Sequence, residues 1–302
     1  MLRNFEELVA AVAAKPQKSL LAIAAAEDEA VIDAALRANA FGIAEPVYVG
    51  DSEKISAILQ AKGVSPSACN IVACQPGQAG QRAAELVKDG QAQVLMKGLL
   101  ETRDFLGPIV KKENGLRTGG VMSHVALFQI PGYERLLLSS DGGMLMYPTL
   151  EEKVHIIENA AKTMHALGYE RPAFAVICAI EKTNPKMPET VEAARLQEMN
   201  LAGEITGCEV VGPISYDVAM SEAIAHHKKY DCSYCGHFDG VIPPNIQAGN
   251  IMGKCLTVTA GAKMAGIIVG AKAPVIMTSR GSDADEKFNS IAMAALCAGG
   301  TK

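Results

Sequence analysis

The sequence predicts an α/β protein built as two α/β/α domains, each with a mostly parallel sheet. Short apolar runs rich in Val, Ile and Leu alternate with amphipathic stretches of helical spacing. The composition agrees, because 49% hydrophobic residues with 28 glycines and only 5% aromatic residues suit an Ala/Val/Ile-rich α/β protein. A length of 302 residues exceeds that of one ordinary domain.

The first part of the chain alternates regularly between strands and helices. The predicted strands are Ser19–Ala24, Pro46–Gly50, a strand at Val72, and Val94–Lys97. The predicted helices are Phe5–Ala14, Glu27–Ala40, one that starts at Asp51, and Gly80–Lys88. This order favours a parallel sheet covered on both faces, with functional residues at the carboxyl ends of its strands. Lys97 and Gly98 lie at such an end.

From about Thr118 the pattern changes. Val125–Phe128 and Glu134–Ser139, joined through Pro131-Gly132, predict two adjacent antiparallel strands. The elements expected after them are helices at Thr149–Leu167, Pro188–Met199, Val218–His226 and mainly Ile246–Ala265, and strands at Phe174–Ile180, Glu209–Val211 and Gly240–Ile242. We therefore predict a discontinuous first domain over 1–130 plus 270–302, and a second domain over 131–269.

Charge and hydropathy exclude several classes of function. The net charge of −5 comes without a basic stripe, so we expect no nucleic acid partner. No apolar run approaches the roughly 20 residues that span a bilayer, and the acidic N-terminus lacks the apolar region of a signal peptide. We expect no membrane partner.

The eight cysteines do not resemble a small disulfide framework, because several lie singly inside apolar segments. A reducing cytoplasm is the expected location. Cys232-Ser-Tyr-Cys235, with histidines at His226, His227 and His237, offers donors that zinc uses. Because no second cysteine pair stands at finger-like spacing, a solvated loop is favoured and no metal site is predicted.

The segment Pro274–Lys287 has the pattern of an anion site. Pro274–Thr278 predicts a buried strand, Ser279-Arg280-Gly281 interrupts it, and a helix follows. Ser282 can cap that helix, with Asp285 completing a capping box. A helix N-terminus beside an arginine suits phosphate, since backbone N–H groups and the guanidinium both match its oxygens. The alternative is an ordinary capped helix after a core strand.

Several segments together carry a family resemblance. They are Met96-Lys-Gly-Leu-Leu-Glu-Thr102, Gly115-Leu-Arg117 with Ser123-His-Val125, Glu181-Lys-Thr-Asn-Pro-Lys-Met187, Gly212-Pro-Ile-Ser-Tyr-Asp217, Pro244-Asn-Ile-Gln-Ala-Gly-Asn250 with Lys254, and Ser279-Arg280. In this order they resemble the phosphate acetyl/butyryltransferase family, with the butyryl branch nearest. Each segment alone is weak, but the ordered set covers nearly the whole chain and is specific.

The resemblance implies two α/β domains with the active site in the cleft between them. It implies transfer of an acyl group, butyryl or similarly short, between CoA and inorganic phosphate. CoA and acyl-CoA, phosphate and acyl phosphate are then the small-molecule partners, with CoA a substrate and no metal or redox cofactor required. It also implies a homodimer or a higher homo-oligomer.

The resemblance assigns roles to four residues of the Pro274–Lys287 segment. Arg280 would hold phosphate, and Ser279 would donate to the reacting carbonyl or thiol. The family's basic carboxylate stands seven residues after that serine, at Glu286, with Asp283 as a nearby rival. The CoA thiol, with a pKa near ~8.5, needs such a base to become the attacking thiolate.

Six further residues are expected to bind substrate: Asn250, Lys254, Lys97, Thr102, Asp141 and Ser123. Asn250 follows the strand Gly240–Ile242 and is predicted to open a helix, where its amide can reach an anion or simply cap that helix. Lys254, one turn later, adds a positive charge on the same face. Asp141 either orients its neighbours or hydrogen-bonds a turn.

The chain also departs from the family pattern. Glu286 replaces the aspartate of the acetyl branch. A second arginine that contacts phosphate in that branch is missing near Gly107. Arg103 is either a substitute for it or a surface residue. Three further departures lie on segments expected to line the cleft: Leu145, Gln247 and Gly253. Two alternatives therefore stay open, namely acetyl specificity and a catalytically silent relative that binds CoA or acyl phosphate and regulates a partner.

Overall fold

The computed structural model describes residues 1–278 and 281–298. Within them the chain forms two compact units. The amino-terminal unit consists of Phe5–Gly120 with Ala265–Lys302, and the central unit consists of Val121–Met264 with Met1–Asn4. Both contain helices and a largely parallel sheet, so the predicted α/β class is confirmed.

The sheet of the amino-terminal unit has the order β3-β2-β1-β4-β11-β10. Its strands are β1 Ser19–Ala24, β2 Ala44–Gly50, β3 Asn70–Ala73, β4 Val94–Lys97, β10 Lys263–Val269 and β11 Val275–Ile276. All neighbouring pairs are parallel except β10 with β11. The last strand, β11, thus lies beside β4, so the carboxyl ends of these two strands meet at one edge.

Six helices of the amino-terminal unit are α1 Phe5–Ala13, α2 Glu29–Ala40, α3 Ser52–Ala61, α4 Ala79–Lys88, α5 Thr102–Val110 and α11 Ala284–Ala298. The chain steps outward from β1 to β3 and returns through α4 to β4. Right-handed crossovers then place α2 and α3 on one face of the sheet and α4 on the other. The direction reverses between β1 and β4, where sheets of this kind bind ligands.

The helix starts follow from local capping. Asp28 accepts a hydrogen bond from the backbone of Val31 at 2.9 Å and begins α2, and Asp51 does the same for α3. Both starts lie within two residues of the predicted ones. The short helix α5 was missed, because Pro108 inside it is a residue that normally ends a helix.

The sheet of the central unit has the order β5-β6-β9-β7-β8. Its strands are β5 Ser123–Gln129, β6 Leu136–Ser139, β7 Ala173–Cys178, β8 Glu209–Ser215 and β9 Gly240–Ile242. β5 and β6 pair antiparallel, as predicted, whereas β6, β9, β7 and β8 are parallel. Ser123 at the start of β5 therefore shares an edge of the sheet with the carboxyl end of β6.

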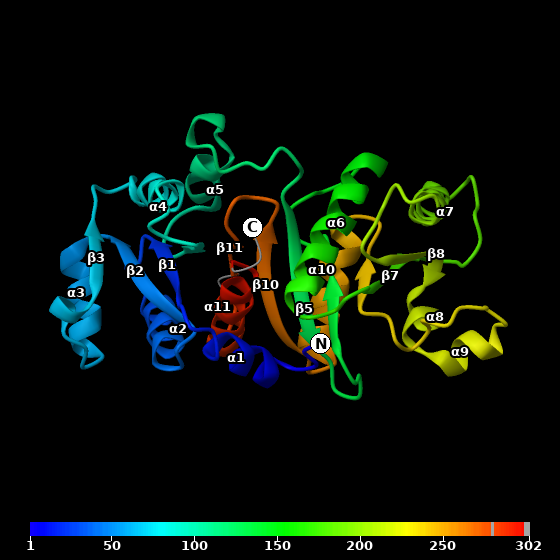
Figure 1. Cartoon of the computed structure of the whole chain (residues 1–302), viewed down its shortest axis with the longest axis horizontal. Coiled ribbons are helices and arrows are strands. Elements are labelled where there is room, and N and C mark those ends of the chain that lie inside the picture. The colour runs from blue at the N-terminus through cyan, green and yellow to red at the C-terminus, as the bar shows by residue number, and fades with distance from the viewer. Residues whose placement is uncertain (279–280, 299–302) are drawn as a thin grey trace. The chain divides into compact units, whose positions relative to one another are not determined.

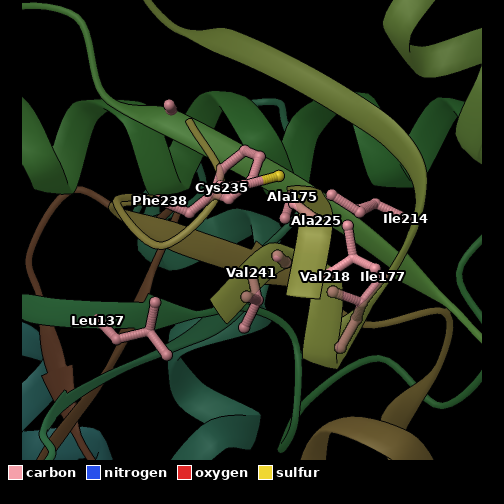
Figure 2. Close-up of a cluster of buried hydrophobic side chains, with 11 residues drawn as sticks. Leu137, Ala175, Ile177, Ile214, Val218, Ala225, Cys235, Phe238 and Val241 are labelled. Carbon is pink, nitrogen blue, oxygen red and sulfur yellow. The ribbon is translucent and has the colours of Figure 1, made fainter. Parts of the chain in front are cut away.

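The helices of the central unit include α6 Leu150–Ala166, α7 Pro188–Leu201, α8 Tyr216–Met220, α9 Glu222–His227 and α10 Ile246–Lys254 (Figure 1). Figure 2 shows one core, in which Ala175 and Ile177 of β7 meet Val218 and Ala225 from α8 and α9. The sequence predicted a single helix over Val218–His226, but Ser221 interrupts it and caps α9 instead.

One predicted helix ends several residues earlier than expected. Ile246–Ala265 was expected to be mainly helical, but α10 ends at Lys254 and continues only as a π-helical turn, η3, Cys255–Thr259. Gly261, at φ +68°, then turns the chain into β10. Apolar residues on both sides of that glycine hid the change from helix to strand. None of the described helices is both long and apolar enough to cross a membrane.

Candidate active site

The first turn of α11 carries the two predicted base candidates. Glu286 Oε1 accepts a hydrogen bond from the Ser282 hydroxyl at 2.5 Å. Asp283 Oδ1 accepts one from the backbone N–H of Glu286 at 2.7 Å, as an N-cap residue does. The predicted cap, Ser282 with Asp285, was therefore wrong, because Asp283 stands closer to the helix and its carboxylate occupies the capping position. Ser279 and Arg280 lie outside the described residues.

Asp285 has a different role in the same turn. Its carboxylate pairs with Arg37 of α2 at 2.6 Å, and the Arg37 guanidinium lies 4.0 Å from the centre of the Phe288 ring. The ring of Phe41 contacts Phe288 edge-on. These contacts attach the start of α11 to α2, and α11 and α2 run side by side in Figure 1.

The end of β4 packs tightly on the end of β1. The backbone N–H of Gly98 donates to the carbonyl of Ala24 at 2.8 Å, and a Cβ on Gly98 would lie 2.1 Å from the carbonyl oxygen of Ala25. Only glycine permits this approach. Lys97 donates from Nζ to the Gly98 carbonyl at 3.3 Å. Lys97, predicted to bind substrate, therefore lies at the carboxyl end of β4, beside the point where the strand order reverses.

Thr102 is the first residue of α5, and both Thr102 and Arg103 are exposed. α5 packs on α4, where a Cβ on Gly80 would lie 2.4 Å from the carbonyl oxygen of Asp104. The predicted substrate-binding role of Thr102 and the substitute role of Arg103 remain predictions.

In the central unit, the carboxylate of Asp141 organises the loop that follows β6. It is only 2% exposed, and it accepts hydrogen bonds from four backbone N–H groups: Gly143 at 2.7 Å, Met144 at 2.8 Å, His124 at 3.0 Å and Leu145 at 3.2 Å. Of the two roles predicted for Asp141, this geometry favours the turn. These four hydrogen bonds hold the loop in shape, and the predicted contact of Asp141 with substrate remains a prediction.

The start of α10 lies against this loop. Asn245, not Asn250, caps α10, accepting from the backbone of Ala248 at 3.1 Å. The prediction that Asn250 opens the helix was therefore wrong by one turn. Asn250 donates from its amide to the Gly142 carbonyl at 3.1 Å and is otherwise exposed. Lys254 is exposed at the last position of α10.

Two neighbours of this loop come from the start of β5. Ser123 is fully buried, and its hydroxyl accepts a hydrogen bond from Asn159 at 3.0 Å. This contact suits a supporting role more than direct contact with a substrate. The His124 ring lies against Gly143, where a Cβ would be 3.0 Å from the ring. Loss of hydration lowers the pKa of His124, and the nearby Asp141 carboxylate opposes that shift.

The structure also brings together a polar cluster at the ends of β7 and β8 that was not singled out from the sequence. Lys228 lies 3.0 Å from the carboxylates of both Glu181 and Asp217. The Ser215 hydroxyl also contacts both carboxylates, and its single proton serves one of them at a time. Hydrogen bonds from Ser215, and then the Lys228 charge, lower the pKa of Glu181 and Asp217. The signal available in the sequence was that two of the family segments, Glu181–Met187 and Gly212–Asp217, lie at or just after the ends of two predicted strands.

The cysteine pair of the central unit is mostly covered by the core. Cys235 is 2% exposed, and burial raises the pKa of its thiol to about 12, with Cys232 adding to the rise. A zinc ligand must be a thiolate, which this environment disfavours. Among the residues that the structure describes, no three His, Cys, Asp or Glu side chains are placed to hold a metal ion.

Known proteins resemble this chain over its full length. Residues 77–295 match the family described as phosphate acetyl/butaryl transferase. Phosphate butyryltransferase of Clostridium acetobutylicum is 44% identical over 301 residues, which are 99% of each chain. Phosphate acetyltransferase of Thermotoga maritima is 42% identical over 293 residues, 97% of this chain and 99% of the relative. A branched-chain phosphotransacylase structure from Enterococcus faecalis V583 has a TM-score of 0.81 at 30% identity, covering 93% of this chain and 99% of that one.

The chain belongs to the phosphate acetyl/butyryl transferase family, which confirms the resemblance carried by its ordered segments. It is a phosphate acyltransferase, an enzyme of the transferase class.

Proposed function

We propose that this enzyme transfers a butyryl or similarly short acyl group between CoA and inorganic phosphate, without a metal or redox cofactor. In the reverse direction the CoA thiolate attacks the carbonyl carbon of the acyl phosphate, and the tetrahedral intermediate expels phosphate as the new thioester forms. Two butyryltransferases, at 44% and 42% identity, support a butyryl preference. Acetyl specificity is the second candidate, since an acetyltransferase is 42% identical.

The observation that carries the catalytic part is the different use of two neighbouring carboxylates. Asp283 is engaged as the cap of α11, whereas the Glu286 carboxylate accepts a hydrogen bond from the Ser282 hydroxyl and has no capping role. Accepting a hydrogen bond does not prevent a carboxylate from taking a proton. Glu286 stands at the family's base position and is not needed to cap the helix, so we assign it as the base, oriented by Ser282 before substrate arrives.

The anion is assigned to the residues just before this turn. Arg280 holds phosphate with its planar fork, and Ser279 donates to the reacting carbonyl or thiol, by their place in the family pattern. Asn250, Lys254, Lys97 and Thr102 are proposed as further substrate contacts. Asp141 and Ser123 are proposed to support the loop beside Asn250.

The setting belongs to the same proposal. A cytoplasmic location is supported by eight cysteines that are all free thiols. A homodimer or higher homo-oligomer is supported by the family resemblance alone, and light scattering on the purified protein tests it.

The experiment compares Glu286→Gln with Asp283→Asn. Glutamine removes the base, so kcat for thiol release from butyryl-CoA with phosphate should fall about 10²-fold or more, within the range of general-base contributions. Asparagine still caps the helix, so Asp283→Asn should stay within about threefold of wild type. A series of acetyl-, butyryl- and branched acyl-CoA ranks the acyl preference. Near wild-type turnover in Glu286→Gln would rule out Glu286 as the base. An equal loss of activity in both variants would count against the proposal, because it would not separate a base from a helix cap.

A further inference from the structure

Ser282 is held at two of its atoms by two consecutive residues of α11. Its hydroxyl donates to Glu286 Oε1 at 2.5 Å, and its carbonyl accepts a hydrogen bond from Lys287 Nζ. Ser282 stands two residues before the start of α11, at Ala284. Whatever fixes Ser282 therefore fixes the turn that leads into α11 and, through the hydroxyl, the Glu286 carboxylate.

Lys287 is an unusual residue to find at this point. It is 8% exposed, and lysine is rarely buried unless it is paired, because removing an ammonium from water is costly. Its ammonium donates to a backbone carbonyl of the turn, which offsets part of that cost. A lysine whose only function was solubility would keep its charge in water. Because Lys287 is buried, its hydrogen bond to the Ser282 carbonyl holds the Ser282 peptide in place.

The hydroxyl of Ser282 then acts on the carboxylate. A hydrogen bond donated to a carboxylate favours its ionised form, which is the form that accepts a proton. It also removes one rotational freedom of a glutamate side chain, which is longer by one methylene than the aspartate of the acetyl branch. Because the longer side chain has more rotamers, the hydrogen bond from Ser282 restricts its conformations more than it would restrict those of an aspartate.

We infer that Ser282 and Lys287 are positioning residues for the reaction: Lys287 fixes the Ser282 peptide, and the Ser282 hydroxyl holds the Glu286 carboxylate ready for the thiol proton. The inference rests on the proposed function, in which Glu286 is the base. Neither residue is assigned a contact with substrate.

Other charged groups around this turn also influence the pH at which the Glu286 carboxylate titrates. Those that the described contacts place on the turn or on the helix it begins are Asp283, Asp285, Lys287, Arg37 from α2, and Lys15, which follows α1. Lys15 contacts the carbonyls of Ala295 and Leu296 at the other end of α11. The negative charge of Asp285 is paired with the positive charge of Arg37. Removing the Ser282 hydroxyl changes none of these charges.

The test is the pH profile of kcat/KM for Ser282→Ala, Ser282→Thr and a matched control, Ser290→Ala. Ser290 lies in the same helix, but its hydroxyl donates to the Glu286 backbone carbonyl at 2.7 Å and accepts from Gly266 N–H at 3.0 Å. Alanine at 282 should move the acid limb about one pH unit higher, because a donor to the ionised carboxylate is lost. It should also lower kcat/KM on the neutral plateau about tenfold, because the carboxylate is no longer held in position. Threonine should restore the wild-type limb.

Ser290→Ala should lower the melting temperature at least as much as Ser282→Ala and leave the acid limb in place. A melting curve of each variant shows that the protein is folded. Lys287→Met is the second variant, in case alanine at 282 prevents folding. It should lower kcat about tenfold while the KM values for CoA and phosphate stay within about twofold, and Lys287→Arg should recover part of the loss.

The outcomes separate this inference from the proposed function. If Glu286→Gln is inactive but Ser282→Ala keeps the wild-type acid limb, the base assignment stands and the positioning role is wrong. If Ser290→Ala moves the limb as far as Ser282→Ala, the effect is general destabilisation and the inference is also wrong. If Glu286→Gln keeps full activity, both the base assignment and the inference fall.

Discussion

At the scale of single residues, the acidic side chains of the two units do different physical work. Asp141 is buried and saturated by four backbone N–H groups, so its charge holds a loop. Asp283 caps a helix, and Asp285 binds Arg37. Glu286 is partly buried and its carboxylate is held by a side-chain hydroxyl. Residue type alone did not separate these roles.

Replacing Asp141 by asparagine tests the loop account. One oxygen becomes an NH₂ group that faces backbone donors, so at least one buried N–H loses its partner. A hydrogen bond to a charged group contributes about 1.5–3 kcal/mol, and a buried donor left without a partner costs about 1–3 kcal/mol, so Asp141→Asn should lower the free energy of unfolding by about 2–4 kcal/mol. Urea denaturation measures it. Exposed Asp231→Asn is the control and should change stability by less than about 0.5 kcal/mol; an equally small effect at Asp141 would contradict the loop account.

Residue roles near α11 show why the cap was predicted wrongly. Ser282 and Asp283 both favour N-cap positions, and only the start of the helix decides between them. In the structure the helix starts at Ala284, so Asp283 caps it and the hydroxyl of Ser282 becomes available for Glu286. Sequence patterns rarely fix a helix boundary to one residue.

At the scale of elements, the contact between the loop after β6 and helix α10 depends on glycine. A Cβ on Gly249 would lie 2.8 Å from the carbonyl oxygen of Asp141 and 2.9 Å from the Cα of Gly142, both of which are backbone atoms. Neither can move without disturbing the Asp141 loop. The close approach also places the Asn250 amide on the Gly142 carbonyl.

Gly249→Ala should therefore destabilise the protein by about 1–3 kcal/mol, the usual cost of overpacking, and lower activity as well. Gly253→Ala in the same helix is the control. Its added Cβ would meet one ring carbon of Phe128 at 3.2 Å, and the better helix propensity of alanine offsets a small shift of that ring. Urea denaturation of both variants checks this. Equal stability of the two would mean that the loop and α10 are not closely packed.

The elements themselves were largely predictable where their signal was local. Apolar strands such as β1, and helices with strong caps such as α6, begin and end near the expected residues. The elements that failed depend on a single interrupting residue. Ser221 separates α8 from α9, and Gly261 separates η3 from β10. Apolar periodicity on both sides of such a residue looks continuous.

At the scale of the whole molecule, the order of motifs along the chain was enough to predict the family, and the comparisons confirm it. What the sequence did not reveal was which side chains meet across strands. Glu181 follows β7, Asp217 lies in α8 and Lys228 caps the end of α9, and they meet where the neighbouring strands β7 and β8 end. The turn at Asp141 likewise depends on His124, which lies seventeen residues earlier on an antiparallel strand.

The central claim is that phosphate and the acyl phosphate are bound by the segment before α11. It is tested most directly by thiol release from butyryl-CoA with phosphate varied, for wild type, Arg280→Ala and Arg280→Lys. An arginine fork that supports developing charge contributes about 2–4 kcal/mol, and each 1.36 kcal/mol is tenfold. Arg280→Ala should therefore lower kcat/KM for phosphate about 10²-fold or more, lysine should recover only part, and the Kd for CoA should stay within about threefold. Near wild-type turnover and phosphate dependence in Arg280→Ala would contradict the account.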